Sequence, residues 1–154
     1  SIEKFSSYIS DKYGIETLAG KLGDLNKVDI LCTATPSTES LFNNQDLKEG
    51  VHINAIGSFK PGMREVPNET VVKAKVVVDS LSASKKEAGD LILTEKETSW
   101  TFDDVYSEIG LITSANLPGR LEDSELTMFK SVGLGFQDLA ITELVIERYN
   151  SYNS

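Results

Sequence analysis

Residues 28–65 decide the fold of this chain, and they read VDILCTATPSTESLFNNQDLKEGVHINAIGSFKPGMRE. Two short apolar runs, VDILCTATPS and VHINAIGSFKPG, each end abruptly in small, polar or glycine-containing sequence. Near-continuous apolar runs of this kind are typical of strands buried in a parallel sheet. In open α/β sheets the ligand lies outside the carboxyl ends of such strands. The small residues at 33–37 and 54–58 are therefore the first candidates for a cofactor surface.

On both sides of this stretch, helix-like and strand-like patterns alternate along the chain. Apolar residues at helical spacing predict a helix over residues 1–13, and a β-branched run predicts a strand over 76–80. Alternation of this kind favours a parallel sheet. The other expected elements of this part are a short strand at 15–19, a weak helix at 21–27, strands at 28–34 and 51–56, and a helix near 68–74.

The remainder of the chain is predicted to be helical and rich in loops. Helices are expected over 81–93 and 102–109, followed by a polar connector over 113–124. The last element, 125–150, is expected to be two helical pieces or a loop that leads into a helix, because Gly133 and Gly135 interrupt it. The predicted fold class is α/β, an incomplete Rossmann-like parallel sheet flanked by helices, with a long carboxyl-terminal helix.

Composition excludes several classes of function. The 154 residues carry a net charge of −9, which argues against a nucleic-acid partner, because phosphate binding depends on Lys and Arg. No apolar run approaches the roughly 20 residues that a membrane span needs. The single histidine, His52, excludes a multi-histidine metal site, and no metal is expected. The single cysteine, Cys32, is expected in the core and is compatible with a cytoplasmic location.

One expected motif is missing. A dinucleotide-binding fold carries a glycine-rich turn after its first strand and a ribose-binding residue at the end of its second. The sequence contains no such turn and opens on a predicted helix. We therefore expect the chain to correspond to the latter part of a nucleotide-binding domain, with residues 1–112 forming sheet and helices and residues 113–154 a connector and a terminal helix.

Six sequence blocks in order resemble the carboxyl-terminal half of the ornithine cyclodeaminase/mu-crystallin family, from about residue 1 to residue 148. The blocks are VDILCTATPS, GVHINAIGSFKPGMREVP, VVVDS, KKEAGDL, IG and TMFKSVGLGFQDLA. The resemblance implies a homodimeric, NAD- or NADP-dependent oxidoreductase that acts on a small amino acid or a cyclic imine. It also implies that the terminal helix returns toward a separate substrate and dimerisation domain.

The resemblance assigns the candidate cofactor residues one by one. Their small side chains would let a planar ring approach the backbone, and their hydroxyl and N–H groups could bond the carboxamide. The alternative is an ordinary turn between strand and helix, which prefers the same residue types. For the last residue of the set, a hydroxyl at the start of a helix is equally compatible. The set is Thr33, Ala34, Thr35, Ser37, Asn54, Ala55, Ile56, Gly57 and Ser131.

Phe59 departs from the family pattern. In cyclodeaminases this position resembles a catalytic aspartate, whereas a phenyl ring can neither accept nor donate a proton. The resemblance therefore favours a ketimine or pyrroline-carboxylate reductase over an ornithine cyclodeaminase and leaves the catalytic acid/base unassigned. A non-catalytic nucleotide-binding or interaction protein is the other hypothesis. The 154-residue chain by itself is expected to have little or no activity.

Overall fold

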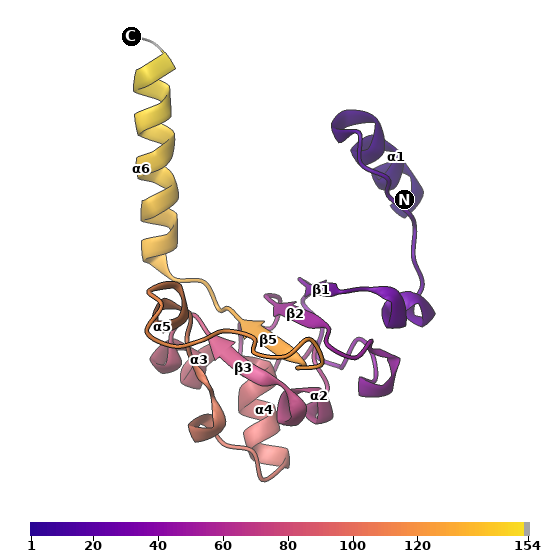
Figure 1. Ribbon diagram of the computed structural model, residues 1–154, viewed down its shortest axis with the longest axis vertical. Coiled ribbons are helices and arrows are strands. Elements are labelled where there is room, and N and C mark those ends of the chain that lie inside the picture. The colour runs from indigo at the N-terminus through magenta and orange to yellow at the C-terminus, as the bar shows by residue number, and fades with distance from the viewer. Residues whose placement is uncertain (153–154) are drawn as a thin grey trace.

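The computed structural model describes residues 1–152 and shows a five-stranded parallel sheet (Figure 1). The strand order is β1-β2-β5-β3-β4. In the register of the central strands, Thr33 lies opposite Ala55, Ala55 opposite Lys130, and Lys130 opposite Val78. Four strands therefore end at the same level. The strands are β1 (Ile30–Thr33), β2 (His52–Ala55), β3 (Lys75–Val78), β4 (Ser107–Glu108) and β5 (Thr127–Lys130).

One face of the sheet is covered by three helices, and the core lies between these helices and the sheet. These are α2 (Asn68–Lys73), α3 (Leu81–Glu87) and α4 (Gly89–Glu97), which lie below the sheet in Figure 1. Ile53 and Ala55 of β2 point into this core, whereas His52 and Asn54 alternate to the other face. Burial of each large aliphatic side chain stabilises the fold by about 1.5–3 kcal/mol. The core residues include Val51, Ile53, Val66, Val71, Val76, Val78, Leu91, Ile92, Trp100, Phe102 and Met128.

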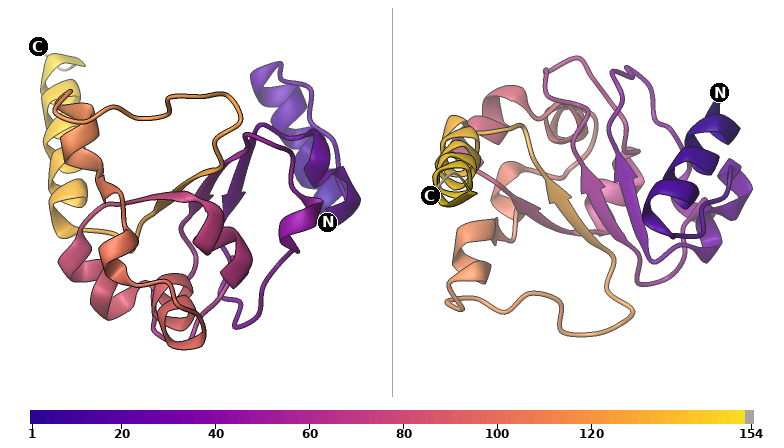
Figure 2. Two further views of the ribbon diagram at one scale, coloured as in Figure 1. Left: turned by 60° about the horizontal axis from the view of Figure 1, so that its bottom comes forward. Right: turned by 90° about the horizontal axis from the view of Figure 1, so that it is seen from above.

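The opposite face is only partly covered. After β4, the short helix α5 (Ile109–Thr113) and the segment 114–126 cross this side before the chain enters β5 (Figure 2). Cys32 is exposed rather than buried, so its predicted core position is wrong. The physical reason is that its side chain alternates with Leu31 and points to this open face, not toward the helices.

The first and last helices extend away from the sheet at opposite sides of it (Figures 1 and 2). α1 (Ile2–Tyr13) ends at Gly14, whose positive φ of 65° allows the left-handed cap. Neither α1 nor α6 (Gly135–Tyr152) has a buried residue. Three 3-10 helices complete the described elements: η1 (Leu22–Lys27), η2 (Asn44–Asp46) and η3 (Phe102–Asp104).

Most of the predicted elements are confirmed, and three are wrong. The expected strand at 15–19 is not a strand. The helix expected over 102–109 is the 3-10 helix η3 followed by β4 and the start of α5. For 125–150, two helical pieces or a loop that leads into a helix were expected, but residues 127–130 form the strand β5, and the helix begins only at Gly135. Residues 153–154, at the end of the predicted connector and terminal helix (113–154), lie outside the described residues.

Candidate functional site

The carboxyl ends of the neighbouring strands form one continuous edge. Beyond the ladder, the N–H of Ile56 donates to the carbonyl of Thr33 at 2.9 Å. The N–H of Ser131 donates to the carbonyl of Ala55 at 3.2 Å. These bonds place the segments after β1, β2 and β5 side by side, which brings the residues predicted from three separate stretches of sequence to one edge.

The predicted cofactor residues differ in exposure along this edge. Thr33, Ala55, Gly57 and Ser131 are buried, Thr35, Ser37 and Asn54 are half-buried, and Ala34 and Ile56 are exposed. The Oγ1 of Thr33 is buried and has no hydrogen-bond partner among residues 1–152. A buried hydroxyl without a partner is uncommon in folded proteins. A ligand at this strand end would supply one.

The side chain of Glu65 joins two of the predicted segments, and it was not found from the sequence. It is fully buried. Its carboxylate accepts hydrogen bonds from the N–H of Thr35 through Oε1 and from the N–H of Gly57, at 2.8 Å, through Oε2. The expectation that these N–H groups are available for a cofactor carboxamide is therefore wrong, because a protein carboxylate already binds them. Its position in a loop between Met63 and Pro67 carries no local signal of this role.

The buried carboxylate of Asp90 holds the loop that carries Glu65. It lies in the first turn of α4, and its Oδ1 accepts from the N–H of Glu65 at 2.7 Å and of Val66 at 3.0 Å. Its Oδ2 accepts from the hydroxyl of Ser58. Asp90 belongs to the KKEAGDL block, and its contacts here are structural because they hold the loop that carries Glu65.

Lys130, at the end of β5, is the cation of this network. Its side chain is fully buried, and its Nζ lies 3.6 Å from Oδ2 of Asp90 and donates to the carbonyl of Ala55 at 3.1 Å. Burial lowers the pKa of the Lys130 ammonium, against the opposing effect of the Asp90 and Glu65 carboxylates. The network thus links β5, the segment after β2 and α4.

Ser131 is held by Asp79 and does not begin a helix. Its hydroxyl donates to Oδ2 of Asp79 at 2.8 Å, and the same oxygen accepts from the N–H groups of Val132 at 2.9 Å and Gly133 at 3.2 Å. The helix-start alternative is wrong because residues 127–130 are a strand. The carboxylate of Asp79 shapes the turn after β5. The Ser131 hydroxyl also accepts from the N–H of Gly133 at 3.3 Å, which leaves it one lone pair for a further donor.

Phe59 lies at the rim of the same edge, and 44% of its surface is exposed. The ammonium of Lys60 lies 5.6 Å from its ring centroid, at an exposed site. The structure therefore puts an apolar ring where a proton-transferring carboxylate was considered from the resemblance.

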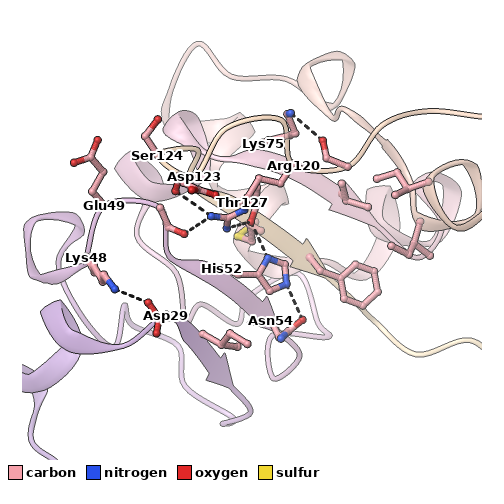
Figure 3. Close-up of a pocket in the computed structure, with 18 residues that line it drawn as sticks. Asp29, Lys48, Glu49, His52, Asn54, Lys75, Arg120, Asp123, Ser124 and Thr127 are labelled. Carbon is pink, nitrogen blue, oxygen red and sulfur yellow. Dashed lines mark hydrogen bonds and ion pairs between the residues drawn. The ribbon is translucent and has the colours of Figure 1, made fainter. Parts of the chain in front are cut away.

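A hollow of about 1110 Å³ lies over the amino-terminal half of the strands, on the open face of the sheet (Figure 3). A series of hydrogen bonds crosses this hollow. It begins with Nη2 of Arg120, which donates to Oγ1 of Thr127 at 2.8 Å. Oγ1 of Thr127 bonds Nδ1 of His52 at 2.8 Å, and Nε2 of His52 bonds Oδ1 of Asn54 at 3.3 Å. The side chain of Asn54 therefore points into this hollow, away from the carboxyl-end edge that holds the other predicted residues.

The described residues offer neither a metal cluster nor a membrane-spanning helix. Among residues 1–152, no group of three or more His, Cys, Asp and Glu side chains could hold a metal ion. In the same part of the chain, no helix has the length and apolar character that crossing a membrane requires.

Comparison with known families adds the decisive observation. The family model described as "Ornithine cyclodeaminase/mu-crystallin family" matches residues 1–153. The chain belongs to this family. The resemblance seen in the six sequence blocks is thereby confirmed over nearly the whole chain, and with it the Rossmann-like α/β class.

Individual members of the ornithine cyclodeaminase/mu-crystallin family resemble the chain closely. A Δ1-pyrroline-2-carboxylate reductase from Bacillus thuringiensis is 39% identical, over 94% of this chain and 45% of its own length. The structure of the Thermococcus litoralis Δ1-pyrroline-2-carboxylate reductase with NADH and L-proline superposes with a TM-score of 0.90 at 35% identity, covering 98% of this chain and 47% of that one. An archaeal alanine dehydrogenase dimer with bound NAD gives a TM-score of 0.87 at 36% identity, covering 99% and 47%. The chain spans about half the length of the relatives it matches.

Proposed function

We propose that this chain is part of an NAD(P)-dependent oxidoreductase that reduces a cyclic imine, of the Δ1-pyrroline-2-carboxylate or ketimine type. The observation that carries the proposal is the edge formed by the carboxyl ends of β1, β2 and β5, where the predicted cofactor residues meet. The relatives named above, one with NADH and L-proline and one with NAD, support the same chemistry.

The residues at this edge fit a nicotinamide cofactor. Thr33, Ala34, Thr35 and Ser37 would line one side of it, with the unpartnered hydroxyl of Thr33 as a donor or acceptor. Ala55, Ile56 and Gly57 would pack beneath the nicotinamide ring, because Ala55 and Gly57 are small and the side chain of Ile56 is exposed at the strand end. Asn54 would contribute through its backbone, since its side chain points to the other face. When bound, the cofactor supplies a hydride to the imine carbon.

Phe59 decides between imine reduction and cyclodeamination within this proposal. Cyclodeamination needs a group that moves protons on the substrate amine, and an aromatic ring cannot do so. Phe59 can instead exclude water from the rim of the site and cover an apolar substrate ring. The catalytic acid/base of the reductase is then a residue outside the predicted set.

The proposal includes the setting of the chain. We infer that residues 1–154 are the carboxyl-terminal portion of the Rossmann domain of a homodimeric, cytoplasmic enzyme, and that residues 113–154 lead back toward its substrate domain. The length ratio to the relatives and the dimeric archaeal neighbour support this inference. Because the reacting groups must be held together in one geometry, we expect the 154-residue chain alone to be inactive.

An assay of the intact protein tests the proposal. We expect consumption of NADH or NADPH with Δ1-pyrroline-2-carboxylate, and no release of ammonia from ornithine. Ammonia release with formation of proline would favour the cyclodeaminase alternative and would show that another residue replaces the aspartate missing at Phe59. Binding of reduced cofactor without its consumption over a series of cyclic imines would favour a non-catalytic protein.

A further inference from the structure

Glu65 bridges two short backbone segments, residues 33–35 at the end of β1 and residues 55–57 at the end of β2. In the described part of the chain, the last backbone–backbone hydrogen bond between these two segments runs from the N–H of Ile56 to the carbonyl of Thr33. Beyond it, the carboxylate of Glu65 bridges the N–H groups of Thr35 and Gly57. At Thr35 and Gly57 the spacing of the two segments therefore depends on this side chain.

The bridge is itself rigidly anchored. The carbonyl of Glu65 accepts from the N–H of Leu41 at 2.9 Å, and its own N–H donates to Oδ1 of Asp90 at 2.7 Å. The neighbouring N–H of Arg64 donates to the carbonyl of Ser37 at 2.9 Å. A side chain fixed on both sides by its own backbone bonds loses little conformational entropy when it holds two further groups.

The two segments pack in direct contact at Gly57, so there is no room for a side chain between them. A Cβ added at Gly57 would collide with the backbone N and O of Thr35 and with the carboxylate of Glu65. Gly57 is therefore required for close approach, and Glu65 fixes the separation that this approach allows. Two parallel acceptor oxygens are needed, which a carboxylate provides and a carboxamide does not.

We propose that Glu65 is a positioning residue, which sets the spacing of the segments after β1 and β2 so that they fit the nicotinamide end of the cofactor. This inference rests on the proposed function, because it assigns the two segments to a nicotinamide cofactor. It adds that a residue without any contact to the cofactor determines how tightly the nicotinamide ring is held. Charge-assisted bonds from backbone N–H groups to a buried carboxylate are suited to this role, because they are stronger than neutral ones.

The test compares two ligands on the Glu65→Gln variant of the intact protein. Glutamine keeps the size of the side chain but presents an NH₂ group to one of the two backbone donors. We expect the Kd for NADH to rise about tenfold, the loss of one such bond. ADP-ribose lacks the nicotinamide ring, so we expect its Kd to change less than about twofold. Titration calorimetry measures both constants.

Glu97→Gln is the matched control. The carboxylate of Glu97 is half-exposed and pairs with Nη1 of Arg64 at 2.9 Å and with Nδ2 of Asn68 at 2.9 Å. The Glu97→Gln substitution makes the same chemical change close to the same loop, without a contact to either segment. Both Kd values should stay at those of the wild type.

Two further measurements keep the inference testable if the glutamine variant does not fold. Gly57→Ala forces the same two segments apart from the other side, so it should also weaken NADH more than ADP-ribose. In the wild-type protein without cofactor, the amide protons of Thr35 and Gly57 should exchange slowly with solvent. Fast exchange of both protons would refute the bridge.

The remaining outcomes separate this inference from the proposed function. A wild-type protein that binds neither NADH nor NADPH contradicts the proposed function. A wild-type protein that binds NADH while Glu65→Gln binds it equally well contradicts only the positioning role. Parallel weakening of NADH and ADP-ribose would also contradict it, because a general structural defect affects both ligands.

Discussion

At the scale of single residues, Lys130 has the largest fully buried side chain among the described residues, and the carboxylates of Asp90, Glu65 and Asp79 favour its charged form against the effect of burial. Asp90 and Glu65 are also fully buried, and Oδ2 of Asp90 lies 3.6 Å from the Lys130 ammonium. Desolvation of a charge costs several kcal/mol unless partners compensate it. Asp90 and Glu65 are compensated mainly by backbone N–H groups, and the amine of Lys130 adds a contact to Asp90.

Replacement of this cation should destabilise the protein strongly. For Lys130→Met, which conserves most of the volume, we expect the free energy of unfolding to fall by about 3 kcal/mol, because the buried carbonyl of Ala55 and the carboxylate of Asp90 lose the amine group that contacts them. The control is Lys73→Met, which removes an exposed ion pair with Glu69 at 2.8 Å and should cost no more than about 0.5 kcal/mol. Urea denaturation of the intact protein measures both. Equal stability of the two variants would contradict the importance of these buried contacts.

The same residue predicts a dependence on pH. Because burial lowers the pKa of Lys130, the folded protein releases this proton at a lower pH than the unfolded chain, whose lysines titrate near about 10.4. Over the interval between the two pKa values the unfolded state binds more protons, so stability rises with pH. Lys130→Met lacks this rise. The difference in unfolding free energy between wild type and variant should therefore grow in the alkaline range, and a shrinking difference would show that the carboxylates raise the pKa instead.

The residues of the strand-end edge were predictable where their own type carried the signal. Small residues after two apolar runs, such as Thr33 and Gly57, indicated a strand-end edge, and the structure shows that edge. Glu65 and Lys130 could not be found in this way. A buried charge is defined by partners far along the chain, as in the 3.6 Å approach of Lys130 to Asp90. Single-sequence patterns describe only near neighbours.

At the scale of the element, β5 shows how far local pattern extends. Leu126, Phe129, Val132 and Phe136 lie at a spacing compatible with a helix, so two helical pieces or a loop that leads into a helix were expected over 125–150, and no strand. The four residues 127–130 form a strand because β2 and β3 pair with them on both sides. At 15–19 the sequence pattern predicts a strand, but this segment pairs with no strand among the described residues and is not one. Strand identity depends on distant partners, whereas helical hydrogen bonds are local.

The packing of α4 against the loop at 60–63 gives a prediction for the element. A Cβ at Gly89 would collide with the carbonyl oxygens of Lys60 and Met63. Gly89→Ala should therefore push the start of α4 from this loop and lower the unfolding free energy by about 1–3 kcal/mol. Gly62→Ala is the control, because a Cβ added at Gly62 would meet no other atom within 4 Å. Its effect should stay within about 1 kcal/mol, and equal losses in thermal denaturation would contradict this packing.

At the scale of the whole molecule, the apolar surface is unevenly distributed. The core lies between the sheet and α2–α4, yet α1 and α6 expose large apolar side chains on both sides of the body. On α6 alone, Phe136 is 64% exposed and Val145 60% exposed. Strand β1 also has one edge without a partner strand among the described residues, and Ile30 on it is exposed. Large exposed apolar faces and open strand edges are the surfaces through which proteins associate.

The 154-residue chain, expressed by itself, should therefore self-associate. We expect its apparent mass in sedimentation experiments to increase with concentration, because burial of the α6 side chains against a second surface removes apolar area from water. A double substitution on the exposed helix, Phe136→Ser with Val145→Ser, should weaken this association. Glu143→Gln, on the same helix, removes a charge without removing apolar area and should leave it unchanged. A monomer at all concentrations would mean that these helices fold back onto the body in solution, so that their apolar side chains are no longer exposed.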